Sequence, residues 1–271
     1  MSMPAAGASL RIMPLGDSIT VGYTDNPAAG GGAGWKTPFE FGYRKQLHAL
    51  LTDAGYDFIF VGKSPEPWAG KFGDPTRGGT VKPTVDLRTM GQDGHRGYGG
   101  WRIGTATKAI GDMIREDKPD VILLMLGING TDAQSAAQLD LLVGAIFRAK
   151  PSVKLIVAQI TPKAPARAAE NDRIRELNAA IATTVVPKYR RQRREISMVD
   201  QFANFLVNPA DLKAVDGRCF SNGINHPNNA VYDRMAATWF QGLAAILPPP
   251  GGRSPGLLKA PQRAAAPAGN G

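Results

Sequence analysis

The sequence predicts a three-layer α/β/α sandwich with about five parallel strands. Two observations carry this prediction. Short apolar runs alternate along the chain with longer stretches in which apolar residues recur at helical spacing. Several of these runs are apolar at nearly every position, which is typical of strands in a parallel sheet whose two faces are covered by the connecting helices.

Five runs are expected to be strands, because they are short, apolar and followed by turn-forming or polar residues. In chain order they are residues 10–15, 57–61, 121–126, 153–160 and 196–199. None approaches the roughly 18 consecutive apolar residues that a membrane-spanning helix needs, so we expect no membrane span.

Three helices are expected from apolar stripes that repeat every three or four residues. The stripes are Leu139, Leu142, Val143 and Ile146; Ile174, Leu177, Ile181 and Val185; and Tyr232, Met235, Trp239, Leu243 and Ile246. Pro151 and Pro187 follow the first two stripes, so we expect these prolines to mark the ends of those helices.

Length and composition fit one domain, residues 1–247, followed by a tail, residues 248–271. The 271 residues are 43% hydrophobic and 20% charged, which is ordinary usage for a globular protein. From residue 248 onward, 16 of the 24 residues are Pro, Gly or Ala and none is aromatic. We expect this tail to be disordered, because ordering it would bury little apolar surface.

Few residues are suited to bind a transition metal. Cys219 is the only cysteine, and the three histidines, His48, His95 and His226, are scattered along the chain. We therefore expect no disulfide within the chain, no metal site and no cofactor.

The charge balance is basic, with a formal net charge of +9. One basic cluster, residues 188–194, is expected to be a solvated turn after a helix. No recognised nucleic-acid-binding motif accompanies the charge, so we do not expect a nucleic acid partner.

Polar residues follow three of the expected strands. Ser18 comes just after the first strand, Asn129 just after the third, and His226 lies in an Asn-His-Pro-Asn stretch before the last helical stripe. The carboxyl ends of parallel strands meet at one edge of the sheet, where ligands bind. A serine nucleophile, an amide that stabilises an oxyanion and a histidine base would meet there. The long loops 25–38 and 62–100 are expected to wall this site.

The segments around these residues resemble the SGNH hydrolases, also called GDSL esterases. Arg-Ile-Met-Pro-Leu-Gly-Asp-Ser-Ile-Thr, residues 11–20, is similar to the first family block, and Gly-His-Arg-Gly-Tyr-Gly-Gly-Trp, residues 94–101, to the second. Leu-Gly-Ile-Asn-Gly, residues 126–130, looks like the third block, with Gly130 where the family usually has aspartate, and His-Pro-Asn looks like the last.

The resemblance covers about residues 10–247 and implies a role for each motif. Ser18 would be the nucleophile and His226 the base. Asn129 and the N–H of Gly100 would bind the oxyanion, with Gly97 as the second candidate for that N–H. The style of the first block, the Gly-Trp pair and Thr161-Pro162 look most like acetylxylan and related carbohydrate esterases.

One position departs from the family pattern. The family usually has an aspartate three residues before the histidine, and this position is Gly223 here. Asn222 aligns there if one residue is inserted. A backbone carbonyl, Asn222 or Asp200 could therefore orient His226, and the remaining alternative is an impaired or non-catalytic site.

Further side chains are candidates for the walls of the site. Trp35 and Trp101 belong to the long loops, where indole rings could stack on sugars or simply anchor the loop. Asp17 is expected to cap or orient the loop that carries Ser18, and lies close enough in sequence to border the substrate. His95 could also line the site.

The sequence thus predicts a serine esterase acting on short acyl esters, with acetyl esters of carbohydrates favoured by the resemblance alone. The rival prediction is a carbohydrate-binding protein on the same scaffold. The resemblance implies secretion, whereas the first nine residues lack a basic start and an apolar core, so the sequence assigns neither a location nor an oligomeric state.

Overall fold

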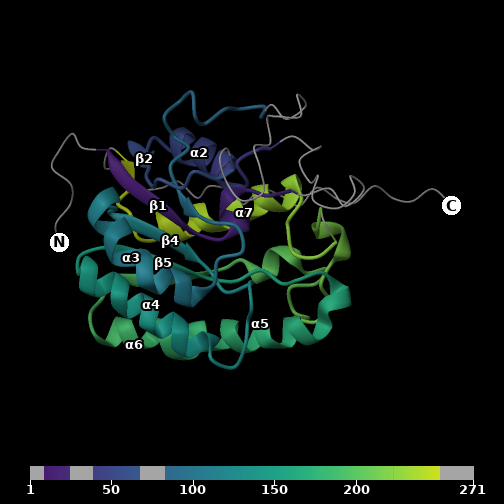
Figure 1. Ribbon diagram of the computed structural model, residues 1–271. Coiled ribbons are helices and arrows are strands. Elements are labelled where there is room, and N and C mark those ends of the chain that lie inside the picture. Colours follow the sequence, from purple (N-terminus) through teal and green to yellow (C-terminus); the bar gives the residue numbers. More distant parts are fainter. Residues whose placement is uncertain (1–8, 25–38, 68–82, 222, 251–271) are drawn as a thin grey trace.

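The computed structural model describes residues 9–24, 39–67, 83–221 and 223–250 and has the predicted three-layer α/β/α architecture (Figure 1). Its parallel sheet has the order β2-β1-β4-β5-β6, and the short strand β3 pairs with β1 beyond the end of β2. The strands are β1 (Leu10–Gly16), β2 (Phe58–Phe60), β3 (Arg96–Gly97), β4 (Val121–Met125), β5 (Lys154–Gln159) and β6 (Ile196–Asp200).

The central pair of strands is β1 and β4. Their register runs from Ile12 opposite Val121 to Gly16 opposite Met125, and every residue of β4 is buried. Helices cover both faces of this pair, which explains why β4 is apolar at every position instead of alternating.

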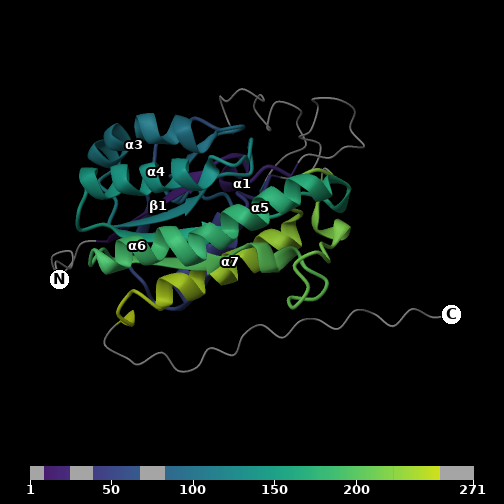
Figure 2. The same cartoon turned by 90° about the horizontal axis from the view of Figure 1, so that it is seen from below.

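Two groups of helices form the outer layers. Helices α2 (Tyr43–Asp53) and α7 (Asn229–Ala244) pack together on one face of the sheet. Helices α3 (Ile103–Asp117), α4 (Ser135–Ala149), α5 (Ala168–Ala180) and α6 (Val186–Arg191) lie on the other face, as Figures 1 and 2 show. The stripe residues predicted for α4, α5 and α7 are buried, apart from Ile246, which packs against the core from a partly exposed position.

The prediction that Pro187 ends a helix is wrong. A π-helical segment, Ile181–Val185, follows α5 directly, and α6 continues the chain as a helix to Arg191. Pro187 lies in the first turn of α6, directly after the π segment, so its ring and its missing N–H fall where the regular α-helical hydrogen-bond pattern is already interrupted. The basic cluster therefore begins inside a helix, where Lys188 forms an ion pair with Asp140.

Among the described strands, the one that the sequence did not predict is β3. It has only two residues, Arg96 and Gly97, which pair with Leu15 and Gly16 of β1. Two residues carry no periodic signal, so hydrophobic patterning cannot find such a strand.

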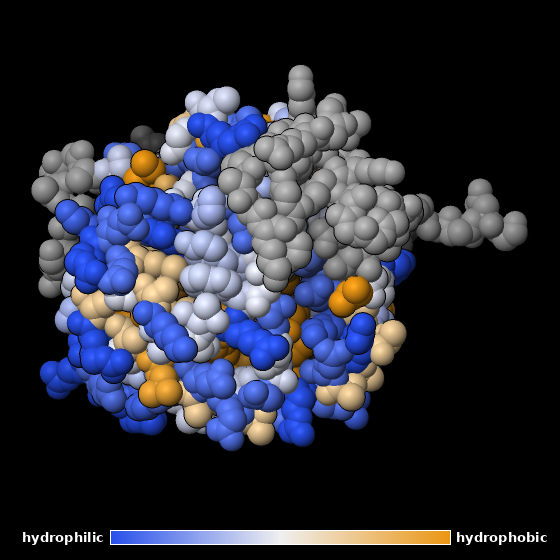
Figure 3. All heavy atoms as spheres, viewed as in Figure 1, coloured by the Kyte–Doolittle hydropathy of each residue, from blue (hydrophilic) through white to orange (hydrophobic). Residues whose placement is uncertain are grey.

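The part of the surface that Figure 3 colours by hydropathy is mainly hydrophilic. On the face seen in Figure 3, hydrophobic residues occur in separate groups among hydrophilic ones. Among the described residues, no helix combines the length and the apolar character needed to cross a membrane. Residues 251–271, most of the tail expected to be disordered, lie outside the described part of the chain.

A buried ion pair fastens β3 to the helix that follows it. The Arg96 guanidinium donates to both carboxylate oxygens of Asp117, at 2.6 and 3.0 Å, and the two side chains are 8% and 2% exposed. Glu116 and the Tyr98 hydroxyl also contact this guanidinium.

We expect Asp117→Ala to lower the free energy of unfolding by about 3 kcal/mol, because it leaves a buried guanidinium without its main partner. The matched control is Asp112→Ala, which breaks the exposed pair with Arg115 on the same helix and is expected to cost less than about 0.5 kcal/mol. Urea denaturation of both variants measures the difference. Equal midpoint shifts would contradict the structural role of the buried pair.

Candidate active site

Ser18 lies directly after the central strand β1. Asp17 caps the short helix α1 (Ser18–Val21), and Ser18 is the first residue of that helix. The turn into α1 requires Gly16, since a Cβ there would lie 2.2 Å from Thr20 Oγ1 and 2.5 Å from the Met125 carbonyl oxygen. As the first helical residue, Ser18 also has a backbone N–H with no carbonyl one turn earlier to receive it.

His226 is brought to Ser18 from the far end of the chain. Its Nε2 lies 2.9 Å from Ser18 Oγ, a hydrogen-bond distance. The histidine loop is held by the pairing of Phe220 with Pro227 and by the Ser221 N–H, which donates to the His226 carbonyl at 2.9 Å. With Nδ1 protonated, Nε2 accepts the serine proton, so the pair has the geometry of a nucleophile and its general base.

Asn129 and Gly100 come from two further loops at the same sheet edge. The Asn129 side-chain amide donates to the Trp101 carbonyl at 3.2 Å, which ties the loop after β4 to the loop after β3. Residues Tyr98 to Trp101 form a turn in which the Trp101 N–H donates to the Tyr98 carbonyl. Gly100 has φ = +76°, a left-handed conformation that favours glycine.

The backbone N–H groups of Gly97, Gly99 and Gly100 differ in their hydrogen-bond acceptors. The Gly97 N–H donates to His95 Nδ1 at 3.0 Å, so it is not available to an oxyanion, and Gly97 is ruled out as the second candidate. The Gly99 N–H donates to the Glu66 carboxylate at 2.8 Å. The described part of the chain offers the Gly100 N–H no acceptor.

Asp17 is buried beneath the site, as expected of a capping residue, and does not line the substrate surface. Its Oδ1 accepts from the Ile19 N–H at 3.0 Å, and the residue is 2% exposed. Burial raises its pKa to about 6, against the lowering effects of the Ile19 hydrogen bond and of the electrostatic interaction with His226.

His95 is also a buried structural residue and not part of the site wall. Its Nδ1 accepts from Gly97, so Nε2 carries the proton and donates to the Glu66 carbonyl at 2.9 Å. Burial, reinforced by Arg44 and Arg96, holds its pKa well below the ordinary value. The neutral imidazole therefore bridges two loops.

Asp200 is the one acid among the groups proposed to orient His226, and among the described residues it forms no hydrogen bond with that ring. Asp200 is exposed at the end of β6, and its Oδ1 accepts from the Ala203 N–H at 3.0 Å. Asn222 lies outside the described residues. Gly223, which stands in place of the family aspartate, has φ = +65°.

Of the two predicted tryptophans, the described part of the chain includes Trp101. Its ring stacks on Tyr98 with centroids 4.0 Å apart and planes tilted by 18°. The indole is half-buried and its carbonyl contacts Asn129, so it borders the loop that carries the amide. Trp35 lies outside the described residues.

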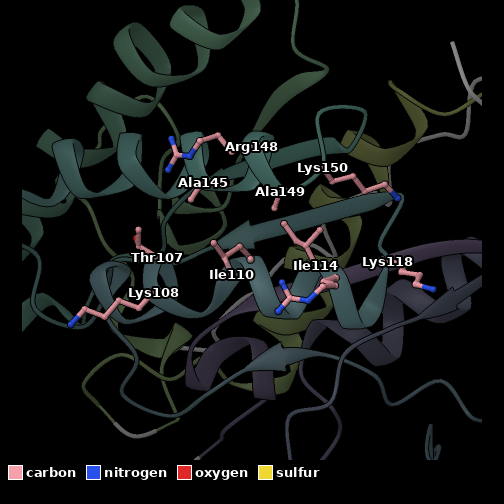
Figure 4. Close-up of a pocket in the computed structure, with 11 residues that line it drawn as sticks. Thr107, Lys108, Ile110, Ile114, Lys118, Ala145, Arg148, Ala149 and Lys150 are labelled. Carbon is pink, nitrogen blue, oxygen red and sulfur yellow. The ribbon is translucent and has the colours of Figure 1, made fainter.

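A separate cavity of about 820 Å³ lies between α3 and α4 (Figure 4). Its lining includes five cations, Lys108, Arg115, Lys118, Arg148 and Lys150. Residues 118 and 150 come just before β4 and β5, so the cavity extends toward the amino edge of the sheet, whereas Ser18 and Asn129 lie at its carboxyl edge. In the residues that the structure describes, no group of three or more His, Cys, Asp or Glu side chains is placed to hold a metal ion.

Comparison with known proteins relates this architecture to esterases. No protein-family model matches the chain. A family 3 carbohydrate esterase of Clostridium thermocellum superimposes with a TM-score of 0.60 and 23% identity, covering 86% of this chain and 94% of that one. A lipase/acylhydrolase of Enterococcus faecalis gives 0.58 and 16%, covering 89% and 98%. The fold is that of the SGNH hydrolases.

Two further proteins named as esterases are similar to this chain. A catalytic mutant of an acetylxylan esterase from Geobacillus stearothermophilus has a TM-score of 0.55 and 16% identity, covering 87% of this chain and 94% of that one. In sequence, a multidomain esterase of Ruminococcus flavefaciens is 31% identical over 146 residues. That match covers 47% of this chain but only 15% of the relative.

Asp17 gives the site a testable pH signature. A raised pKa means that the group supports folding fully below its ordinary value of 3.8 and that this support is lost as the pH rises through about 6. We expect Asp17→Asn, which keeps an oxygen for the Ile19 N–H, to remove this loss.

Relative to wild type, Asp17→Asn should therefore gain about 2.4 kcal/mol of stability between pH 4 and pH 7.5. Urea denaturation at both pH values measures the gain, and Ser18→Ala serves as the neighbouring control that keeps the wild-type pH dependence. A pH-independent difference between Asp17→Asn and wild type would contradict the raised pKa.

Proposed function

We propose that this protein is a serine esterase that hydrolyses short acyl esters through an acyl-serine intermediate. The observation that carries the proposal is the 2.9 Å contact between Ser18 Oγ and His226 Nε2 at the carboxyl edge of the sheet. A serine nucleophile requires a base within hydrogen-bond distance of its hydroxyl. A serine with a purely structural role does not require a histidine at that position.

In the proposed reaction His226 takes the Ser18 proton as Oγ attacks the ester carbonyl carbon. The tetrahedral intermediate collapses when the imidazolium returns the proton to the leaving alcohol. Water, deprotonated by the same histidine, then attacks the acyl-serine and releases the carboxylic acid.

Three donors are suited to hold the oxyanion. They are the Asn129 side-chain amide, the Gly100 N–H and the Ser18 N–H. Preorganised donors of this kind stabilise the charge that develops on the carbonyl oxygen and often supply the largest part of the rate enhancement.

The substrate class we propose is an acetyl ester, with a carbohydrate as the alcohol. The names of the related proteins, a family 3 carbohydrate esterase and an acetylxylan esterase, support this choice. The stacked Trp101 and Tyr98 rings beside the Asn129 loop add an aromatic surface of the kind on which sugars stack.

Ser18→Ala tests the proposal directly. We expect the variant to fold normally and to lose hydrolysis of p-nitrophenyl acetate, because it removes one hydroxyl at a strand end. Ser152→Ala, an exposed serine in the turn before β5, is the control and should retain wild-type activity. A fluorophosphonate should label wild type at Ser18.

Labelling at another serine would contradict the assignment of Ser18. Equal hydrolysis by wild type and Ser18→Ala, together with retention on acetylated xylan, would favour the rival binding protein.

The group that orients His226 gives a second prediction. We propose that it is an amide or a backbone carbonyl, because the Asp200 carboxylate is exposed at the end of β6 and the hydrogen bond it accepts comes from the Ala203 N–H, not from His226. Asp200→Asn should therefore change kcat/KM for p-nitrophenyl acetate by less than about threefold. In a serine protease with a Ser-His-Asp triad, the corresponding replacement of aspartate by asparagine lowers kcat about 10⁴-fold. A loss of orders of magnitude in a folded Asp200→Asn variant would restore a triad with Asp200.

A further inference from the structure

The buried side chain of Glu66 joins two parts of the candidate site. The residue is 7% exposed and follows β2 on the long loop. Its Oε2 accepts from the Gly99 N–H at 2.8 Å and from the Tyr23 hydroxyl at 2.7 Å. No Lys or Arg forms an ion pair with it in the described part of the chain. A carboxylate buried without a cation is costly, and these two donors are what stabilise it.

One donor belongs to the turn that presents the oxyanion hole. In the turn from Tyr98 to Trp101, the hydrogen bond that closes the turn uses the Trp101 N–H, so it does not engage the N–H groups of the two central residues. Glu66 takes the first of them, that of Gly99, and the N–H of Gly100 is left for a ligand. The Tyr98–Gly99 peptide also carries the carbonyl that closes the turn, so holding its N–H restrains the turn whose next peptide carries the Gly100 N–H.

The other donor, the Tyr23 hydroxyl, belongs to a ring that packs beside His226. The Tyr23 ring lies 5.9 Å from the His226 ring between centroids, and the Tyr232 hydroxyl donates to the Tyr23 carbonyl at 2.8 Å. One carboxylate oxygen thus connects the oxyanion turn with a ring that packs beside the base.

The backbone around Glu66 reinforces the same connection. Its carbonyl accepts from His95, and the Ser64 hydroxyl donates to the Gly97 carbonyl at 2.6 Å. Residues 64–66 therefore hold residues 95–99 at several points, and the carboxylate holds the end of that segment nearest to Gly100.

We propose that Glu66 is a positioning residue that sets the Gly100 N–H for the oxyanion, an inference that rests on the proposed esterase function. It touches neither the nucleophile nor the base. It acts through the Gly99 peptide on one side and through Tyr23 on the other.

Glu66→Ala is the first test. We expect kcat for p-nitrophenyl acetate to fall about 10- to 100-fold, less than the loss of a whole donor, while KM changes little. Glu40→Ala is the matched control, because Glu40 is also 7% exposed but binds Lys45 and Thr84 instead of the oxyanion turn. Equal losses in the two variants would overturn the proposal.

A double-mutant cycle separates positioning from general damage. Asn129→Ala removes a donor of the same hole and is expected to cost about 10² to 10³ in kcat. If Glu66 acts through that hole, the double variant should lose less than the product of the two single losses, because the two sites are coupled. Strictly multiplicative losses would overturn the proposal.

Amide hydrogen exchange gives a readout that does not depend on activity. The Gly99 amide should exchange faster in Glu66→Ala than in wild type and Glu40→Ala, because it loses a buried acceptor. Unchanged exchange would overturn the positioning role even if no ester were hydrolysed. An inactive wild type with the expected exchange would instead overturn only the esterase function.

Glu66→Gln and Tyr23→Phe keep the test decisive if Glu66→Ala does not fold. Glutamine retains an oxygen acceptor without the charge, so we expect faster Gly99 exchange and a loss in kcat of less than about tenfold, since bonds to charged acceptors are about twice as strong. Tyr23→Phe leaves the Gly99 bond in place and should leave Gly99 exchange at the wild-type rate. Wild-type exchange and kcat in Glu66→Gln would overturn the proposal.

Discussion

The candidate site depends on the parallel pairing of β1 with β4. This pairing places Gly16 opposite Met125, so that the chain leaves both strands at the same level of the sheet. Ser18 follows two residues after one strand end and Asn129 four residues after the other. β3 pairs with the last two residues of β1 and starts the loop to Gly100 at the same level. The backbone pairing thus brings the segments that carry Ser18, Gly100 and Asn129 to the same level of the sheet.

Below this edge, the structure buries polar groups that stabilise the loops instead of the core. Arg44 is 1% exposed, and it donates to the carbonyls of Thr20, Val21 and Asp93, which secures the chain just after Ser18. Burial lowers its pKa to about 10, so the guanidinium stays charged at neutral pH. Buried polar groups with several partners specify one arrangement of the chain at a cost in stability. Asp17, buried directly beneath the nucleophile, likewise lowers the stability of the fold when it is ionised.

The sequence was sufficient for the five longer strands of the sheet and for the order of the motifs, and insufficient for the short strand β3 and for the contacts between loops. The strand runs are apolar because both faces are covered, and that signal is local. Glu66 lies in the long loop without periodicity, and nothing near it in sequence marks its contact with Gly99. Its partner is 33 residues away, so only the folded chain reveals the bond. The Gly97 contact is different in kind, because His95 is only two residues away, but hydrophobic patterning carries no signal for a hydrogen bond between a ring nitrogen and a backbone N–H.

This division between local and long-range signals also bears on the low identity to the structural neighbours, 16 to 23% in the three compared. A doubly covered strand accepts many apolar side chains of similar volume, so its sequence is free to change while the fold is kept. The positions at the sheet edge are not free in this way. A side chain at Gly16 would collide with both Thr20 and the backbone of Met125, because two strands and a helix start meet there. The fold therefore accepts many apolar residues in the core strands but few residue types at the end of β1, where the chain turns into the helix that begins with Ser18.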